Sequence, residues 1–353
     1  MAATQRERTR CVDPLVDGLY QRLLDRQASR LFHSTPWLHV LHDAYAFEPR
    51  ALLALGPDGE PAAGIVACRI ADAMGTRIVS LPFSDYCDPL VESGADWETL
   101  FDALRARAER VIFRCVHNAV PAADSRLAIL KTARWHGLSL LPDLPAVWRG
   151  LEPSRQRAIR RARQQGLGLA VPGNDGFLDA FYRLHLGVRK HKYRLLAQPR
   201  RFFDAIRRRF EQANGWYPLA AQCGGRIVAA VILLRWGRTL YYKFSASDQG
   251  ALHLKPNDFL LWRAIELAGE LGCAQLDLGL SDDDQSGLVR FKRQFGAEEK
   301  EIRFLCHDPG GATPAAVGEL RSALGRLTQL LTDPAVPDEV TSEAGDLLYR
   351  YFA

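Results

Sequence analysis

The chain has 353 residues, of which 47% are hydrophobic, and a formal net charge of +5. This length suits two domains with well-filled cores, and the mild positive charge favours anionic partners such as CoA, nucleotide-linked intermediates or RNA. Seven cysteines without a C-x-x-C pair argue against a disulfide framework or a zinc site. The longest apolar run, 227–234, is too short to span a bilayer, and residues 1–10 lack a signal-peptide core, so we expect a cytoplasmic protein.

The first part of the chain, residues 1–150, reads as a mixed α/β domain. Its pattern predicts helices at 17–28, 37–46 and 97–110, and strands at 51–55, 64–70, 77–81 and 111–116.

The second part, residues 151–307, predicts another α/β domain, followed by a helical tail at 308–353. Expected helices lie at 154–165, 177–190, 199–213, 257–271 and 288–295, and expected strands at 219–222, 227–235, 239–246 and 274–280. In the tail, we expect helices at 313–331 and in a last segment that ends at Phe352. The predicted class is α/β (α+β), with mostly antiparallel sheets flanked by helices.

A lysine and an aspartate stand out in the second domain. Leu288, Phe291 and Phe295 form one apolar stripe of a short helix and leave Lys292 beside it, where it can reach into a cleft. Asp277 points away from its leucine neighbours on a buried strand, so it is either a site residue or a structural hydrogen-bond acceptor.

Two adjacent tyrosines face opposite sides of one strand. Because Tyr242 is followed two residues later by Phe244, we expect these two to share the core face, which leaves Tyr241 for a proton-relay or binding role.

The segment 80–86 joins a strand to a proline-containing loop. Ser84, Asp85 and Tyr86 gather polar groups behind Phe83, which is typical of a substrate pocket and also of a simple Asx turn.

Basic residues cluster in two places. Arg157, Arg160 and Arg161 share one face of a helix with five arginines and no acid between Arg155 and Arg163. Arg189, Lys190, Lys192 and Arg194 surround His191 and Tyr193 and form a second candidate anion-binding cluster.

Several blocks of the sequence, in order from about residue 30 to 305, resemble the Fem-like branch of the GNAT acyltransferase superfamily. In the C-terminal half they are Tyr241–Asp248, Pro256–Asn257, Leu260–Trp262, Asp277–Gly279 and Phe291–Lys292 with Phe295–Gly296. Upstream of these they are Phe32–Trp37, Ser80–Tyr86, Arg157–Ala162 with Gly166, and Phe181–His185 with Arg189 and Phe202–Phe203.

The resemblance implies two tandem GNAT-like domains with a cleft between them. It assigns Lys292 to the donor carbonyl charge, with Asp277 and Tyr241 as helpers. The residues expected to bind substrate are Phe83, Ser84, Asp85, Tyr86, Arg189, Tyr193, Asn257 and Trp262, and those expected to bind anions are Arg157, Arg160, Arg161 and Lys192.

The donor has two candidates. A CoA-binding loop needs closely spaced glycines for its backbone N–H groups to reach the pyrophosphate, whereas residues 247–255 contain one glycine. The chain also lacks the long charged helical arm with which some peptidyl transferases contact tRNA, so acyl-CoA and aminoacyl-tRNA both stay open.

We therefore expect a cytoplasmic acyl- or aminoacyl-transferase that acts by direct attack of an amine or hydroxyl of a small or carrier-linked acceptor, without a metal. The chain has no Gly-x-Ser-x-Gly elbow for a covalent intermediate. The alternatives are a non-catalytic RNA- or partner-binding protein and, from Asp282–Asp284, a metal-dependent glycosyltransferase.

Overall fold

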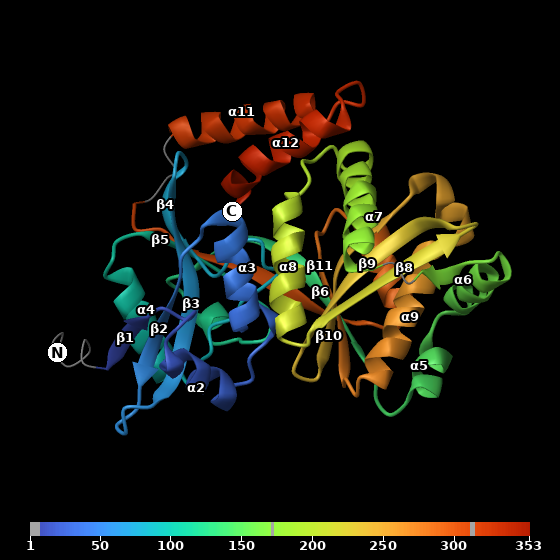
Figure 1. Ribbon diagram of the computed structural model, residues 1–353. Coiled ribbons are helices and arrows are strands. Elements are labelled where there is room, and N and C mark those ends of the chain that lie inside the picture. Colours follow the sequence, from blue (N-terminus) through green and yellow to red (C-terminus); the bar gives the residue numbers. More distant parts are fainter. Residues whose placement is uncertain (1–7, 171–172, 311–314) are drawn as a thin grey trace. The chain divides into compact units, whose positions relative to one another are not determined.

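The computed structural model describes residues 8–170, 173–310 and 315–353, which form two compact units (Figure 1). The first unit combines the chain up to Arg134 with Lys300–Ala323 and Ala353, and the second combines Trp135–Glu299 with Leu324–Phe352. The predicted boundaries at 150 and 307 differ from these, because two strands, β6 (Ala128–Ser139) and β12 (Glu298–His307), each begin in one unit and end in the other.

The first unit is built on strands in the order β1-β2-β3-β4-β5-β12. Its pairs are antiparallel except for β4 with β5. Its core includes the stacked rings of Trp97 and Phe101, which pack against Phe113. The elements are β1 (Thr9–Val12), α2 (Gly18–Arg26), α3 (Thr35–Tyr45), β2 (Pro49–Leu55), β3 (Pro61–Asp72), β4 (Gly75–Val79), α4 (Gly94–Arg105) and β5 (Arg110–Cys115).

The second unit has the strand order β6-β11-β10-β9-β8-β7, with β10 and β11 parallel. Its strands and sheet-covering helices are α5 (Leu144–Gly150), α6 (Pro153–Gln164), β7 (Gly168–Ala170), α7 (Asn174–Gly187), α8 (Arg200–Gln212), β8 (Trp216–Cys223), β9 (Arg226–Trp236), β10 (Thr239–Ser247), α9 (Pro256–Glu270) and β11 (Gln275–Ser281). It continues with α10 (Ser286–Gln294) and, at the C-terminal end, α12 (Asp338–Leu348). Helix α11 (Ala315–Leu331) spans the boundary at Ala323.

Two helix layers cover the sheet of the second unit (Figure 1). Helix α9 packs against β8, β9 and β10 through the large apolar cluster that contains Leu233, Leu240 and Leu261. Helices α7 and α8 contribute an aromatic layer in which Phe202 and Phe203 contact Phe244 of β10. The α/β class with mostly antiparallel strands, flanking helices and a helical tail is confirmed.

Candidate functional site

The strands β10 and β11 pair over only part of their length. Their parallel register runs from Thr239 opposite Gln275 to Tyr241 opposite Asp277. Beyond this point, a cavity of about 1130 Å³ is lined by Tyr242–Ser247 of β10 and by Leu278 and Leu280 of β11. Because the strands separate here, side chains and backbone groups of both strands can contact one ligand in the cavity.

The remaining walls of this cavity also belong to the second unit. They are formed by His185, Val188, Arg189, Lys192, Tyr193, Leu195, Gln198, Gln249, Asn257, Leu261, Asp282, Asp283, Asp284, Gln285, Ser286, Gly287, Leu288, Phe291 and Lys292. Four predicted site residues besides Lys292 therefore meet here, namely Arg189, Lys192, Tyr193 and Asn257.

Lys292 lies on the cavity wall although its side chain is only 6% exposed. Helix α10 directs it toward β11, where Nζ donates to the backbone oxygens of Gly279 and Leu280, each at 3.1 Å. A buried ammonium needs such acceptors because it has lost most of its water. The two carbonyl oxygens thus fix a cationic group at the cavity surface.

Asp277 contacts the same segment of β11. Its carboxylate is 2% exposed and accepts hydrogen bonds from Trp135 Nε1 at 2.9 Å and from the Gly279 backbone N–H at 2.7 Å. Gly279 has a φ of +66°, a conformation that favours glycine. Asp277 is not among the residues that line the cavity. It is linked to Lys292 through Gly279, which donates to one residue and accepts from the other.

The structure reverses the expected roles of the two tyrosines. Tyr242 lines the cavity, whereas Tyr241 is buried and is not among the lining residues. The prediction assumed that Tyr242 and Phe244 share a face, but a β-bulge lies between them. Because the bulge inserts Lys243, Tyr242 packs toward the α9 cluster while Phe244 faces Phe202 and Phe203.

Burial also affects the ionisation of groups on the wall. It raises the pKa of Tyr242, whereas a hydrogen bond from Ser245 opposes this shift. Burial, aided by the positive charge of Arg189, lowers the pKa of His185 to about 3. His185 Nε2 and Gln198 Oε1 lie 2.8 Å apart in a hydrogen bond. His185 is therefore a neutral hydrogen-bonding group at physiological pH, with little strength as a general base.

Several wall residues were not predicted as site residues. His185 belongs to a block that carried the family resemblance, and this is the signal that would have found it. Lys243 and Gln198 have no such signal, because a bulge and an irregular loop bring them to the wall. Asp282–Asp284 were considered only as metal ligands, and among the residues that the structure describes no cluster of His, Cys, Asp or Glu is arranged to hold a metal.

Trp262 is a core residue rather than part of the cavity wall. It packs edge-on against Trp148 and donates from Nε1 to Glu266 Oε1 at 2.6 Å. Trp262 was expected to bind substrate because it belongs to a block that carries the family resemblance, whereas its neighbour Leu261 is the residue that lines the cavity.

The predicted substrate loop, Phe83–Tyr86, belongs to the first unit, and two of its residues are buried there. Ser84 Oγ accepts a hydrogen bond from Trp37 Nε1 at 2.8 Å. Tyr86 is fully buried and packs edge-on against Phe32. Phe83 adopts a φ of +56° and contacts Tyr45, and only Phe83 and Asp85 of the four are partly exposed. The structure thus gives Ser84 and Tyr86 packing roles instead of the expected ligand contacts.

The arginine strip on α6 is exposed at Arg157, Arg160 and Arg161. Its flanking members are held by acids of α9, since Arg155 pairs with Asp258 at 2.8 Å and Arg163 pairs with Glu266 at 3.2 Å. None of the three exposed arginines is among the cavity residues.

Comparison with known proteins agrees with this geometry. Residues 154–293 match the acetyltransferase (GNAT) domain, and no curated protein matches the sequence. The crystal structure of FemX superposes with a TM-score of 0.63 at 13% identity, covering 80% of this chain and 94% of FemX.

Two further structures share the fold. The C-terminal domain of a putative lysylphosphatidylglycerol synthetase from Agrobacterium fabrum gives a TM-score of 0.55 at 15% identity, covering 87% of this chain and 96% of that domain. A tandem GNAT protein from the clavulanic acid biosynthesis pathway gives a TM-score of 0.54 at 13% identity, covering 86% of this chain and 99% of that protein.

The matched acetyltransferase (GNAT) domain lies within the second unit, which also contains the cavity and Lys292. The chain shares its fold with FemX and with the tandem GNAT protein, in agreement with the Fem-like GNAT resemblance of its sequence motifs. In residues 8–170, 173–310 and 315–353, no helix is long and apolar enough to cross a membrane.

Proposed function

We propose that this protein transfers an acyl or aminoacyl group to an amine or hydroxyl of a small or carrier-linked acceptor, in the cavity between β10 and β11. The observation that carries the proposal is the position of Lys292 on the wall where the two strands separate. The acceptor nucleophile attacks the donor carbonyl directly, and the thioester or ester bond to the leaving group then breaks.

Lys292 supplies electrostatic stabilisation in this scheme. Negative charge develops on the carbonyl oxygen during attack, and a cation that is already fixed in place stabilises it without reorganising. The contacts of Nζ with Gly279 and Leu280 provide this fixed position. Asp277, which accepts the Gly279 N–H, supports the segment of β11 that carries the two acceptor oxygens.

The cationic residues of the cavity favour a donor with phosphate groups. Arg189 and Lys192 lie beyond α7 and Lys243 lies at the bulge of β10, so basic groups from separate elements reach one cavity. Acyl-CoA and aminoacyl-tRNA both carry phosphates. The segment before α9 favours neither, because its Gly250 N–H is already bonded to Asp248 at 2.9 Å.

Binding of the donor tests the proposal. The purified protein would be titrated with acetyl-CoA, a longer acyl-CoA and charged tRNA, with uncharged tRNA as the control for the last. At about 100 times its dissociation constant, a true donor stabilises the protein by about 2.7 kcal/mol, which a thermal-unfolding experiment detects. Failure of every donor to shift the unfolding midpoint would refute the proposal.

The second candidate is a non-catalytic protein that binds RNA or another anionic partner through Arg157, Arg160 and Arg161. The exposure of these arginines on one face of α6 supports it. Uncharged tRNA that stabilises as well as charged tRNA, and that loses this effect in an Arg157→Ala, Arg161→Ala variant, would favour this function.

A further inference from the structure

We infer that the C-terminal helix α12 is a positioning element for the cavity, and that the contact of Asp338 with Lys190 fixes the segment that carries Arg189 and Lys192. The inference rests on the proposed function only in naming a phosphate-bearing donor as the ligand of those residues. Helix α12 lies outside the matched domain 154–293, and its contacts with Lys190, Tyr182 and Arg201 are within the second unit.

The segment Val188–Lys192, which extends α7 as a short π-helix, has two sides with different surroundings. On one side Val188, Arg189 and Lys192 line the cavity. On the other side Lys190 is 1% exposed, and its Nζ donates to Val336 O at 2.5 Å and to Asp338 Oδ1 at 2.7 Å. Because an isolated buried ammonium is costly, Lys190 depends on the two acceptors that the tail supplies.

A π-helical turn is an uncommon arrangement that often marks a functional site. Here the turn is held at both ends. Leu195 N donates to Arg189 O at 3.0 Å, and Arg189 Nε donates to Leu196 O at 2.9 Å, so the following loop folds back on the turn. Arg194, in that loop, donates to Gln329 O at 3.1 Å, just after which α11 ends.

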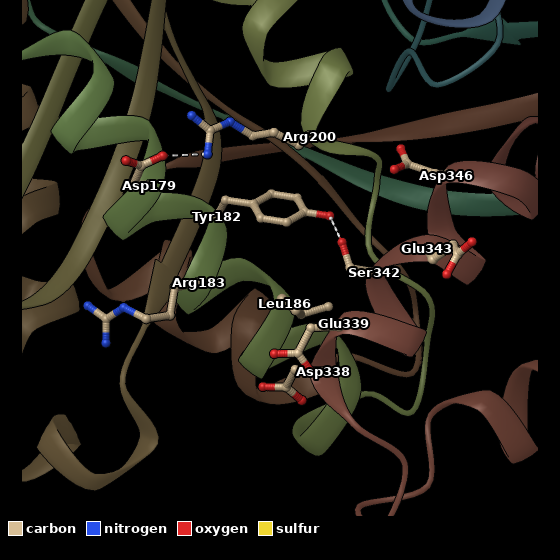
Figure 2. Close-up of a pocket in the computed structure, with 10 residues that line it drawn as sticks. All are labelled: Asp179, Tyr182, Arg183, Leu186, Arg200, Asp338, Glu339, Ser342, Glu343 and Asp346. Carbon is tan, nitrogen blue, oxygen red and sulfur yellow. Dashed lines mark hydrogen bonds and ion pairs between the residues drawn. The ribbon is translucent and has the colours of Figure 1, made fainter.

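The rest of α12 packs closely on the neighbouring elements. A Cβ atom added to Gly345 would lie 2.4 Å from Ala197 O, so only glycine permits this approach of the helix to the loop after Lys192. Figure 2 shows α12 and α7 facing each other across a pocket of about 560 Å³, with Tyr182 and Ser342 directed toward one another and hydrogen-bonded at 2.8 Å. Arg201 of α8 pairs with Asp346 at 2.8 Å.

The consequence is a coupling between the tail and the cavity. If α12 leaves, Lys190 loses Asp338, and if the preceding residue Val336 moves with the helix, Lys190 loses its second acceptor and must move toward water. Arg189 and Lys192 lie on the same π-helical turn, so they move with it. Donor binding and docking of α12 should therefore depend on each other.

Two full-length variants test the coupling by different routes. Asp338→Ala removes a partner of Lys190, and Gly345→Leu forces α12 away from Ala197 without touching Lys190. Glu339→Ala is the matched control, since Glu339 is exposed beside Asp338 on the same helix. Hydrogen exchange of the amides at 188–195 is measured without ligand, and acetyl-CoA affinity is measured by titration calorimetry.

We expect both variants to increase amide exchange at 188–195 and to weaken acetyl-CoA binding by about tenfold. The control should match the unmodified protein in both measurements. If a variant does not fold, Lys190→Met replaces it, because methionine keeps the length of the side chain and removes the buried charge.

Unchanged exchange at 188–195 in a variant whose α12 amides exchange rapidly would overturn the inference. If the unmodified protein binds no acetyl-CoA, the CoA donor of the proposed function fails. The exchange measurement alone then decides whether α12 positions the segment.

Discussion

The position of the Lys292 ammonium group determines whether it can stabilise a developing oxyanion. Its Nζ is anchored by two backbone oxygens of β11, and these oxygens belong to the strand that forms one wall of the cavity. A long flexible side chain is thereby confined to one position, which is the condition for preorganised stabilisation of a developing oxyanion.

We predict that Lys292→Ala lowers kcat by about 100- to 1000-fold, the range found when one oxyanion-stabilising donor is removed. The dissociation constant of the donor should change by less than about threefold, because the charge acts mainly in the transition state. Arg290→Ala is the control, since Arg290 is exposed on the same helix and is not among the cavity residues. A variant with full activity would support the non-catalytic alternative.

The sequence can place a single side chain that stands out against a regular pattern, whereas its catalytic role stays a prediction. Lys292 beside an apolar helical stripe was such a case, and its place on the cavity wall agrees with the prediction. The choice between Tyr241 and Tyr242 failed, because it assumed strict alternation along β10. The bulge forms where β10 pairs with β9, and the sequence of β10 alone does not indicate this pairing.

Among the elements, strand β11 carries both Asp277, which is buried in the sheet, and the backbone oxygens that bind Lys292. Asp277 binds Trp135 of β6 and the backbone of Gly279, and Gly279 binds Lys292. These hydrogen bonds form one continuous series from the interior of the sheet to the cavity wall.

We predict that Asp277→Ala destabilises the protein by about 2–5 kcal/mol, because two buried N–H donors lose their acceptor. Combining it with Trp135→Phe should restore part of the loss, since only one donor then lacks its partner, and the double-mutant cycle measures this coupling. Urea denaturation is the measurement. Additive effects of the two substitutions would contradict the hydrogen bond between their side chains.

Helices and strands with strong periodicity lie close to their predicted positions, such as α9, β11 and α10. The predicted strand ranges did not include β1, β6, β7 or β12. In β6 the exposed first half and the buried second half give no single pattern, because each half belongs to a different unit. The burial of Ser84 was missed for a related reason, since its partner Trp37 lies 47 residues away.

For the whole molecule, buried histidines set the response to acid. Burial is the main cause that lowers the pKa of His33 and of His136 to about 4, compared with 6.5 in the unfolded chain. Below pH 6.5 the unfolded state binds more protons than the folded state, so stability falls as the pH decreases from 6.5 toward 4.

We predict a loss of up to about 1.4 kcal/mol per pH unit for each of these histidines, and a constant contribution above pH 6.5. Urea denaturation at several pH values from 7.5 to 4.5 provides the check. His33→Gln should reduce the change in unfolding free energy per pH unit by the contribution of one histidine. Stability that does not change over this range would show that both imidazoles are already accessible to protons.

The path of β12 has a consequence for synthesis on the ribosome. Strand β5 of the first unit pairs with Arg303–His307, residues that follow the whole contiguous segment 135–299 of the second unit. The edge of β5 that pairs with β12 therefore stays unpaired, and open to aggregation, while residues 135–299 are synthesised. Chaperone occupancy at this edge should end once residue 307 has left the exit tunnel.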